Sequence, residues 1–289
     1  MKIEAFYEPV TFTVSFVVYD ESTKDAVVID PVLDYAPNSA SISRDSADEI
    51  IEFIKKENLN LHYVLESHAH ADHLSSSQIF KKEFPNTKVA INSNITAVQE
   101  VFKGAFNDPH LKTDGSQFDK LLGDEEVVEA GSLKIKTIFT PGHTPACSTF
   151  DINGALFVGD LLFMPDMGTG RCDFPKGSVS DMYDSIKKLY DNYSDDTKIY
   201  VGHDYQPGGR ELEYESTIGE SKKSNIQMRD ATTKEEFTDF RSKRDAQLDH
   251  PKIIYPSIQV NIRAGHLPEE EDNGTSYLKM PVGGADILK

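Results

Sequence analysis

The chain has 289 residues, of which 38% are hydrophobic and 27% charged, and this composition describes a globular protein with one large core. Its 30 Lys and Arg residues against 48 Asp and Glu residues give a formal net charge of −18. Such a surface repels nucleic-acid phosphates and anionic membranes, so we expect neither as a partner. An anionic substrate would need a local cationic pocket.

The cysteine content and the first residues indicate the compartment. Cys147 and Cys172 are the only cysteines, whereas a secreted disulfide scaffold would use more. The segment 1–6 lacks the apolar centre of a signal peptide. No apolar stretch of about 18 residues indicates a membrane span. We therefore expect a cytoplasmic protein.

The first half of the chain is expected to mix strands and helices. Residues 11–19 and 25–30 are rich in Val, Phe and Ile and predict a hairpin around the polar turn 20–24. The apolar run 63–65 predicts a short buried strand. Helices are predicted at 45–57, 74–84 and 95–102, and a further strand at 88–91.

The second half returns to strands before it becomes helical. Asn153-Gly154 is a strong hairpin signal between two apolar runs. Strands are predicted at 126–129, 133–139, 147–152, 155–158 and 198–201, and helices at 180–190 and 233–248. The segment 255–289 is rich in Pro and Gly, so we expect it to wrap the surface. The pattern predicts an α+β fold, with two sheets covered by helices.

The segment His68-Ala69-His70-Ala71-Asp72-His73 places four potential metal ligands within six residues, directly after the predicted strand 63–65. Imidazoles and carboxylates packed this densely repel one another unless a cation or a proton organises them. A polar turn before the next helix is the alternative interpretation. The spacing favours a metal site.

Three further ligand-type residues follow predicted strands. His143 lies after 133–139, Asp160 after 155–158 and His203 after 198–201. Each alone could belong to an ordinary turn, but together with 68–73 they predict one shared site. Imidazole and carboxylate together suit zinc, iron or manganese, and the lack of cysteine ligands disfavours a structural zinc site.

These seven residues, taken in order, resemble the motif series of the metallo-β-lactamase superfamily. The resemblance covers roughly residues 1–210 and implies an αββα sandwich, two mixed sheets flanked by helices with the metal cleft at one edge. It also implies a division into a catalytic core, 1–210, and a helical and loop C-terminal extension, 211–289, packed on that core as a single domain.

Two branches of this superfamily compete. In persulfide dioxygenases, one Fe(II) serves to oxidise glutathione persulfide with O2 to sulfite and glutathione. In glyoxalase II, two zinc ions serve to hydrolyse glutathione thioesters. The run Gly170-Arg171-Cys172-Asp173-Phe174 resembles the G-R-T-D-F of the dioxygenases, and His203-Asp204-Tyr205 resembles their H-D-Y. The C-terminal extension and Gln206 to Arg210 resemble a bacterial branch called β-lactamase-like hydrolase.

The dioxygenase resemblance implies that His68, His143 and Asp160 hold one iron. His70, Asp72, His73 and His203 would then support the site, or hold a second metal in the zinc alternative. Against the negative net charge, Arg171 is the expected partner of the anionic substrate, with Arg210 and Tyr205 as further candidates. Surface solvation of Arg210 and core packing of Tyr205 are the alternatives. A homodimer is common in the family.

Several features depart from the dioxygenase pattern or leave other functions open. The segment 161–170 is longer than in the commoner dioxygenases, and Thr169 and Cys172 stand where many of them have Cys and Thr. Cys172 could be modified by substrate sulfur, but we expect a small buried residue. A lactonase and a metal-dependent sulfur sensor are further alternatives.

Overall fold

The computed structural model describes residues 1–283. The N-terminal half forms a six-stranded mixed sheet with the order β1-β2-β3-β6-β8-β9. Its strands are β1 (Lys2–Glu8), β2 (Thr13–Tyr19), β3 (Asp25–Ile29), β6 (Asn60–Glu66), β8 (Lys88–Asn92) and β9 (Lys120–Leu122). The pairs from β1 to β3 are antiparallel, and those from β3 to β9 are parallel. The predicted hairpin of β2 and β3 is confirmed.

A second six-stranded sheet has the order β10-β11-β12-β13-β14-β15. Its strands are β10 (Val127–Ala130), β11 (Leu133–Phe139), β12 (Ser148–Ile152), β13 (Ala155–Phe157), β14 (Lys198–Tyr200) and β15 (Glu215–Thr217). Only the pair β13 and β14 is parallel. A small third sheet joins β5 (Ser41–Ser43), β4 (Val32–Ala36) and β7 (Leu74–Ser75).

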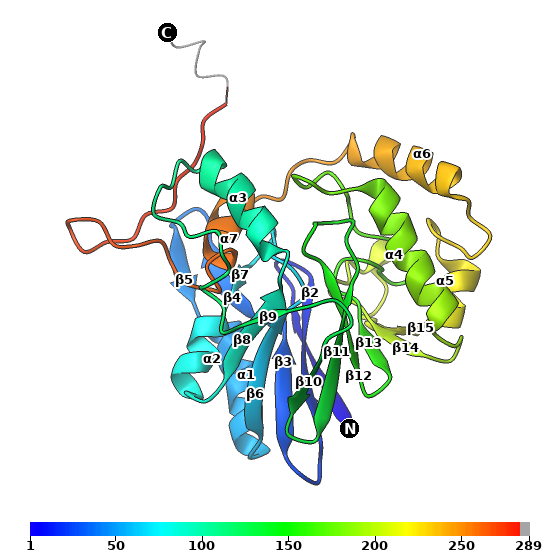
Figure 1. Ribbon diagram of the computed structural model, residues 1–289, viewed down its shortest axis with the longest axis horizontal. Helices are drawn as coiled ribbons and strands as arrows, with labels where there is room; N and C mark the ends of the chain where they lie inside the picture. The colour runs from blue at the N-terminus through cyan, green and yellow to red at the C-terminus, as the bar shows by residue number, and fades with distance from the viewer. Residues whose placement is uncertain (284–289) are drawn as a thin grey trace.

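The two large sheets lie side by side in the middle of the molecule, with helices outside them (Figure 1). Apolar side chains from both sheets form a shared core, in which the Phe16 and Phe157 rings meet at 5.3 Å. Helices α1 (Asp45–Lys56), α2 (Ser77–Glu83), α3 (Ile95–Ala105) and α7 (Ile254–Asn261) accompany the first sheet, and α4 (Val179–Asn192), α5 (Ile218–Ser224) and α6 (Lys234–Asp245) the second. The expected α+β sandwich is confirmed.

Some elements differ from the sequence-based prediction. The strand β1 was not predicted, because its intermediate burial weakens the apolar signal. The helix predicted from Leu74 begins at Ser77, since Leu74 and Ser75 pair with β4. The expectation that 255–289 only wraps the surface is wrong for its first part, where α7 has Ile258 and Val260 fully buried. Residues 284–289, to which the same expectation applies, lie outside the described residues.

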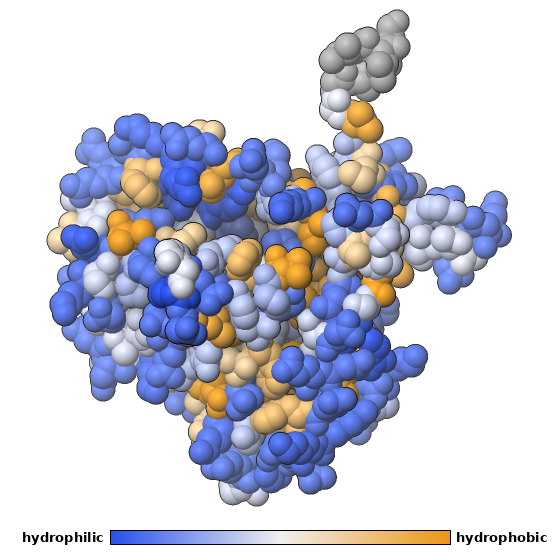
Figure 2. All heavy atoms as spheres, turned by 180° about the vertical axis from the view of Figure 1, so that it is seen from behind, coloured by the Kyte–Doolittle hydropathy of each residue, from blue (hydrophilic) through white to orange (hydrophobic). Residues whose placement is uncertain are grey.

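The outer surface agrees with the acidic composition. Figure 2 shows mainly hydrophilic residues around the rim of the rear face, with apolar residues gathered toward its middle. Within residues 1–283, no helix has both the length and the apolar character needed to cross a bilayer.

Candidate metal centre

All seven predicted ligands lie just past the ends of strands, where the two large sheets meet. The segment 67–73 follows β6, His143 follows β11, Asp160 follows β13 and His203 follows β14. The sheets are joined here, because the Val14 N–H at the start of β2 donates to the Gly202 carbonyl at 2.8 Å. The rigid strands therefore hold loop residues around one cleft.

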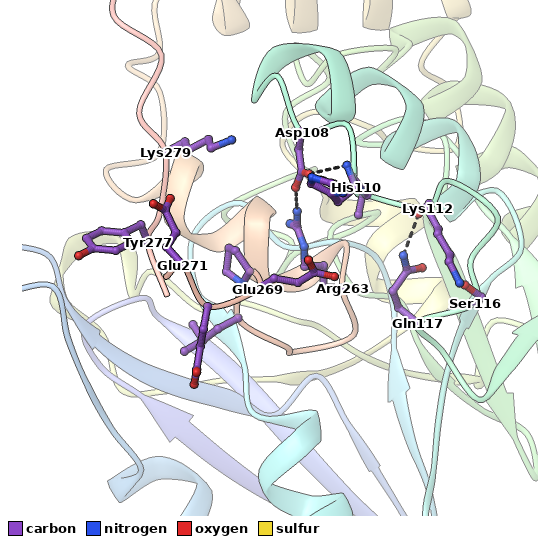
Figure 3. A pocket seen from close by; sticks show the side chains of 14 residues that line it. Asp108, His110, Lys112, Ser116, Gln117, Arg263, Glu269, Glu271, Tyr277 and Lys279 are labelled. Atoms are coloured by element: carbon purple, nitrogen blue, oxygen red, sulfur yellow. Dashed lines mark hydrogen bonds and ion pairs between the residues drawn. The ribbon is translucent and has the colours of Figure 1, made fainter. Parts of the chain in front are cut away.

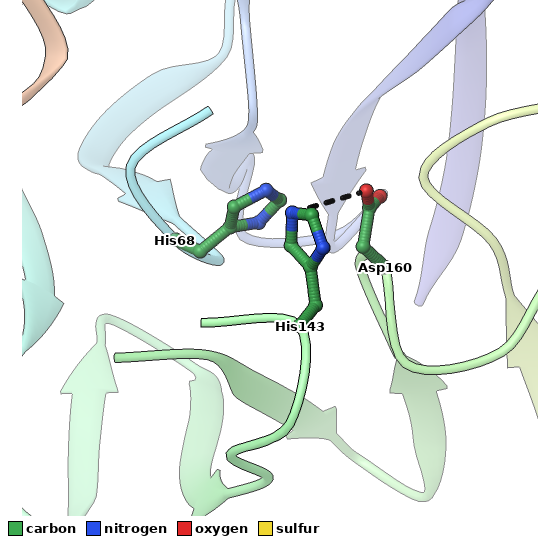
Figure 4. Close-up of side chains that lie close together, drawn as sticks. All are labelled: His68, His143 and Asp160. Atoms are coloured by element: carbon green, nitrogen blue, oxygen red, sulfur yellow. Dashed lines mark ion pairs between the residues drawn. The ribbon is translucent and has the colours of Figure 1, made fainter. Parts of the chain in front are cut away.

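His68, His143 and Asp160 form the first cluster. Their ligand atoms all lie within 4.8 Å of one another, and all three side chains are buried. Figure 4 shows the two imidazoles and the carboxylate converging from three separate loops. The Nε2 of His143 lies 3.6 Å from an Asp160 carboxylate oxygen. Two imidazoles and one carboxylate on one side of a site suit iron or zinc.

A second cluster, His70, Asp72 and His203, adjoins the first and also lies within 4.8 Å. The Nε2 of His203 lies 3.3 Å from an Asp160 oxygen and 3.4 Å from an Asp72 oxygen. His73 completes the set, with its Nδ1 3.7 Å from Asp72 and 3.3 Å from the Thr13 hydroxyl. The structure thus brings all seven predicted residues together.

Many of the potential metal-binding atoms of this site make no hydrogen bond within residues 1–283. Buried atoms without a hydrogen-bond partner in the described part of the chain include His68 Nε2, both ring nitrogens of His70 and His203, His73 Nε2, Asp72 Oδ2 and Asp160 Oδ1. Buried polar atoms are almost always paired, so a concentration of unpaired ones needs an explanation. A bound cation would supply that partner. The residues therefore fit a metal.

The charges of the side chains favour metal binding as well. Burial, together with the neighbouring histidines, holds the pKa of His68 and of His70 well below the usual value, so both imidazoles are neutral. Burial raises the pKa of Asp72, but His203 and His73 outweigh it and hold that pKa well below its usual value. For His203 the opposing effects have the other sign. Burial lowers its pKa, but the Asp160 and Asp72 carboxylates outweigh burial and raise the pKa above its usual value.

Contacts behind the ligands fix their orientation. The Nδ1 of His143 lies 2.6 Å from the Arg171 carbonyl oxygen, which can only accept, so Nδ1 carries the proton and Nε2 faces the site. The Nδ1 of His68 lies 3.0 Å from the Ser67 hydroxyl. Partners of this kind fix the tautomer and ring direction of metal-binding histidines.

A pair of buried carboxylates, which the sequence analysis missed, lies behind His70. Asp30 Oδ1 is 3.1 Å from His70 Nε2 and accepts from the Ser67 N–H at 2.6 Å. Glu66 Oε1 accepts from the Ser75 hydroxyl at 2.5 Å. Burial raises the pKa of both carboxyl groups, and the neighbouring Asp30 raises that of Glu66 further. The sequence contained a signal for this pair, because an acidic residue lies at the end of each of two apolar strands: Asp30 follows β3, and Glu66 is the last residue of β6.

Two glycines permit the close approach of the ligand loops. Gly159 has φ +50°, and a Cβ there would lie 2.7 Å from the Ser67 hydroxyl oxygen. A Cβ on Gly170 would lie only 2.1 Å from the Asp160 carbonyl oxygen. A side chain at either position would therefore require the Ser67 side chain or the backbone of Asp160 to shift.

The predicted substrate-binding residues differ in their surroundings. Arg171 pairs with Asp173 through Nε at 2.5 Å and donates to the Asp249 carbonyl at 2.7 Å. Tyr205 is 37% exposed, and its ring stacks on His203 with centroids 5.7 Å apart, so it borders the metal cleft.

Arg210 has its guanidinium engaged elsewhere. It donates to Asp204 at 2.7 Å, to Asp166 at 2.7 Å and to the Glu211 carbonyl at 2.9 Å. These contacts favour a structural role.

Both cysteines are free and buried. Burial raises the pKa of Cys147 to about 12 and raises that of Cys172 as well. The Cys172 N–H donates to an Asp245 oxygen at 2.9 Å. Cys172 is therefore a small buried residue, as expected from the sequence, and so is Cys147.

A separate cavity of about 540 Å³ lies between the segment 108–117 and the C-terminal residues 263–279 (Figure 3). Its wall carries both signs of charge, including Lys112, Glu269 and Arg263, and the last of these pairs with Asp108. None of the seven ligand-type residues lines it.

Comparison with known proteins identifies the family. Residues 9–203 match the model of the metallo-beta-lactamase superfamily. The chain belongs to this superfamily. The resemblance inferred from the seven residues is confirmed, and the matched range contains every one of them.

Two curated relatives are similar over nearly their whole length. The chain is 47% identical to "Glyoxylase B2" of Dictyostelium discoideum, over 97% of each chain. It is 43% identical to a "Probable metallo-hydrolase" of Burkholderia pseudomallei strain 1710b, over 98% of this chain and 99% of the relative.

The chain is also similar, at lower sequence identity, to proteins named ETHE1. It is 28% identical to "Persulfide dioxygenase ETHE1, mitochondrial" of Homo sapiens, over 91% of this chain and 88% of the relative. Among solved structures, "ETHE1 from Myxococcus xanthus" superimposes with a TM-score of 0.74 at 25% identity, covering 92% of this chain and 100% of that chain. The structural similarity to this protein therefore includes part of the segment that follows residue 203.

Proposed function

We propose that the protein is an Fe(II)-dependent persulfide dioxygenase that converts glutathione persulfide, O2 and water to sulfite and glutathione. Two observations support this proposal: the cluster of His68, His143 and Asp160, whose ligand atoms lie within 4.8 Å of one another, and the 28% identity to a protein named persulfide dioxygenase. Two imidazoles and one carboxylate on one face of an octahedral ion form the facial triad of non-haem iron oxygenases.

A bound Fe(II) would activate O2 and offer open coordination positions for a sulfur and for O2, while the four electrons that reduce O2 would come from the outer sulfur of the persulfide. The protein's part is to keep His68 neutral, to orient the rings of His68 and His143 toward the site, and to hold the reactants close together. His70, Asp72, His73 and His203 would surround the site and hold protons or water. Tyr205, beside His203, would form the wall against which the persulfide lies.

We further propose that Arg171 pairs with a carboxylate of the substrate. Its carbonyl accepts from the ligand His143, so its side chain starts next to the metal cleft. The guanidinium has the bidentate geometry that carboxylates favour. In the structure the Arg171 guanidinium already makes such a contact with Asp173. A substrate carboxylate would have to share that contact or displace Asp173.

Two broader assignments accompany this proposal. Residues 1–210 would be the catalytic core, and 211–289 an extension packed on it within one domain, supported by the buried contacts of α6 and α7. A reducing cytoplasm fits the two free, buried cysteines.

The second candidate is a dinuclear zinc hydrolase of glutathione thioesters. The second cluster, His70, Asp72 and His203, favours it, because these residues could hold another ion beside the first. The 47% identity to a protein named Glyoxylase B2 favours it as well. The ligand types suit both metals, so ligand chemistry does not separate the two candidates.

One experiment separates them. Freshly purified protein is analysed for metal, and then assayed for O2 uptake with glutathione persulfide and for hydrolysis of lactoylglutathione. One iron per chain with rapid O2 uptake would support the dioxygenase. Two zinc ions per chain with thioester hydrolysis would refute it. Asp160→Asn is the control, because both activities require this carboxylate.

A further inference from the structure

The backbone that carries His70 and His73 is held by a residue from the far end of the chain. Asn261, the last residue of α7, donates from Nδ2 to the His70 carbonyl and to the His73 carbonyl, each at 2.8 Å. Its Oδ1 accepts from the Ser75 N–H at 2.8 Å. The side chain is 4% exposed.

In these three bonds both N–H groups of the amide donate and its oxygen accepts. Two N–H groups meet two carbonyls, and one oxygen meets one N–H, so the orientation of the amide is unambiguous. The segment 67–73 contains neither helix nor strand, and its backbone therefore lacks the regular partners of such elements. Buried carbonyl groups need partners, and Asn261 supplies two of them.

The position of these carbonyls matters for the metal cluster. Neither ring nitrogen of His70 makes a hydrogen bond within residues 1–283, although Nε2 lies 3.1 Å from the Asp30 carboxylate. Its ring packs between the rings of His68 at 3.9 Å and His73 at 4.1 Å. The position of the backbone at 68–73 therefore contributes strongly to the direction of the His68, His70 and His73 side chains.

We propose that Asn261 is a positioning residue of the metal centre, which sets the affinity and geometry of the site by clamping the His70 and His73 backbone. This inference rests on metal binding by the clustered residues and does not depend on which metal is native or which reaction follows. It also assigns a task to α7: the C-terminal extension completes the metal loop.

The chain offers a matched control on the same helix. Gln259 is 2% exposed, and its amide also makes three hydrogen bonds, to the Tyr255 carbonyl and to the backbone N–H and carbonyl of Lys279. These partners lie in the C-terminal extension, away from the metal loop. Gln259→Ala should therefore destabilise α7 to a similar degree without moving His70 or His73.

The test compares Asn261→Ala, Gln259→Ala and the unchanged chain, each stripped of metal and reloaded with Co²⁺. Competition with a chelator gives the affinity for Co²⁺, and the visible absorption of the bound ion reports its ligand geometry. We expect Asn261→Ala to bind Co²⁺ about 10- to 100-fold more weakly, with a shifted spectrum. Gln259→Ala should match the unchanged chain in both readouts, although both variants melt earlier.

Equal Co²⁺ affinity and spectra in the two variants would overturn the proposal, whether both change or neither does. If Asn261→Ala does not fold, Asn261→Asp decides, because it keeps the acceptor for Ser75 but loses both donors. Weakened Co²⁺ binding by that variant supports the clamp, and unchanged binding refutes it. Failure of the dioxygenase proposal would appear separately, as Co²⁺ binding without any persulfide oxidation by the iron form.

Discussion

The Nδ1 of His143 and the carbonyl oxygen of Arg171 lie 2.6 Å apart. This contact connects a predicted metal ligand to the segment 169–174. The next residue, Cys172, donates its N–H to Asp245 of α6, and Asp245 also pairs with Arg241 at 2.6 Å. A buried ion pair in the C-terminal extension therefore supports the loop that orients His143.

We predict that Asp245→Ala lowers the free energy of unfolding by about 3–5 kcal/mol, because it leaves the buried Arg241 guanidinium without its carboxylate partner. Urea denaturation measures the loss. Asp239→Ala is the matched control, since Asp239 pairs with Lys243 on the same helix at the same spacing but in solvent. That change should cost less than about 1 kcal/mol. Equal losses would mean that the burial of the pair is unimportant.

A second prediction concerns the backbone around Asp160. Gly170→Ala places a Cβ 2.1 Å from the Asp160 carbonyl oxygen, so the loop must shift. We expect a loss of metal content together with a lower melting temperature. Gly104→Ala serves as the control, because a Cβ at this position in α3 meets no atom within 4 Å. That change should stabilise the helix by up to about 1 kcal/mol. Full metal retention by Gly170→Ala would contradict the packing argument.

The metal residues could be predicted because their signals are local. A ligand-type side chain shortly after an apolar run is visible in the sequence, and β11, β13 and β14 run in the same direction, so their carboxyl ends lie at one edge of the sheet. His143, Asp160 and His203 were each found in this way, and the structure brings them to the cluster at 68–73. Most strands of the two large sheets carry similarly clear apolar runs.

The supporting residues could not be predicted, because their roles depend on contacts between distant segments. Asn261 lies 188 residues from His73, in a segment that its Pro and Gly content placed on the surface. Asp245 belongs to a polar helix whose sequence does not show that two of its charges are buried. Short strands such as β7 form only because a partner strand, here β4, lies beside them.

The two cysteines provide a third prediction. Burial raises the pKa of Cys147 to about 12 and raises that of Cys172, so both thiols stay protonated at pH 8. Because the thiolate is the reactive form, iodoacetamide should modify neither residue in the native protein but both in urea. Mass spectrometry after a timed exposure measures this. Rapid native labelling of Cys172 would instead support a direct part in sulfur chemistry.

The last prediction tests Arg171. Arg171→Ala should raise the KM for glutathione persulfide by about 10- to 100-fold, the effect expected from losing one charge-assisted hydrogen bond. Metal content should be unchanged, because His143 bonds to the backbone carbonyl of this residue, which alanine retains. Lys198→Ala, which removes an exposed cation paired with Glu215, controls for the general loss of positive charge. Loss of metal in Arg171→Ala, or a KM equal to that of the control, would show that substrate carboxylates are bound elsewhere.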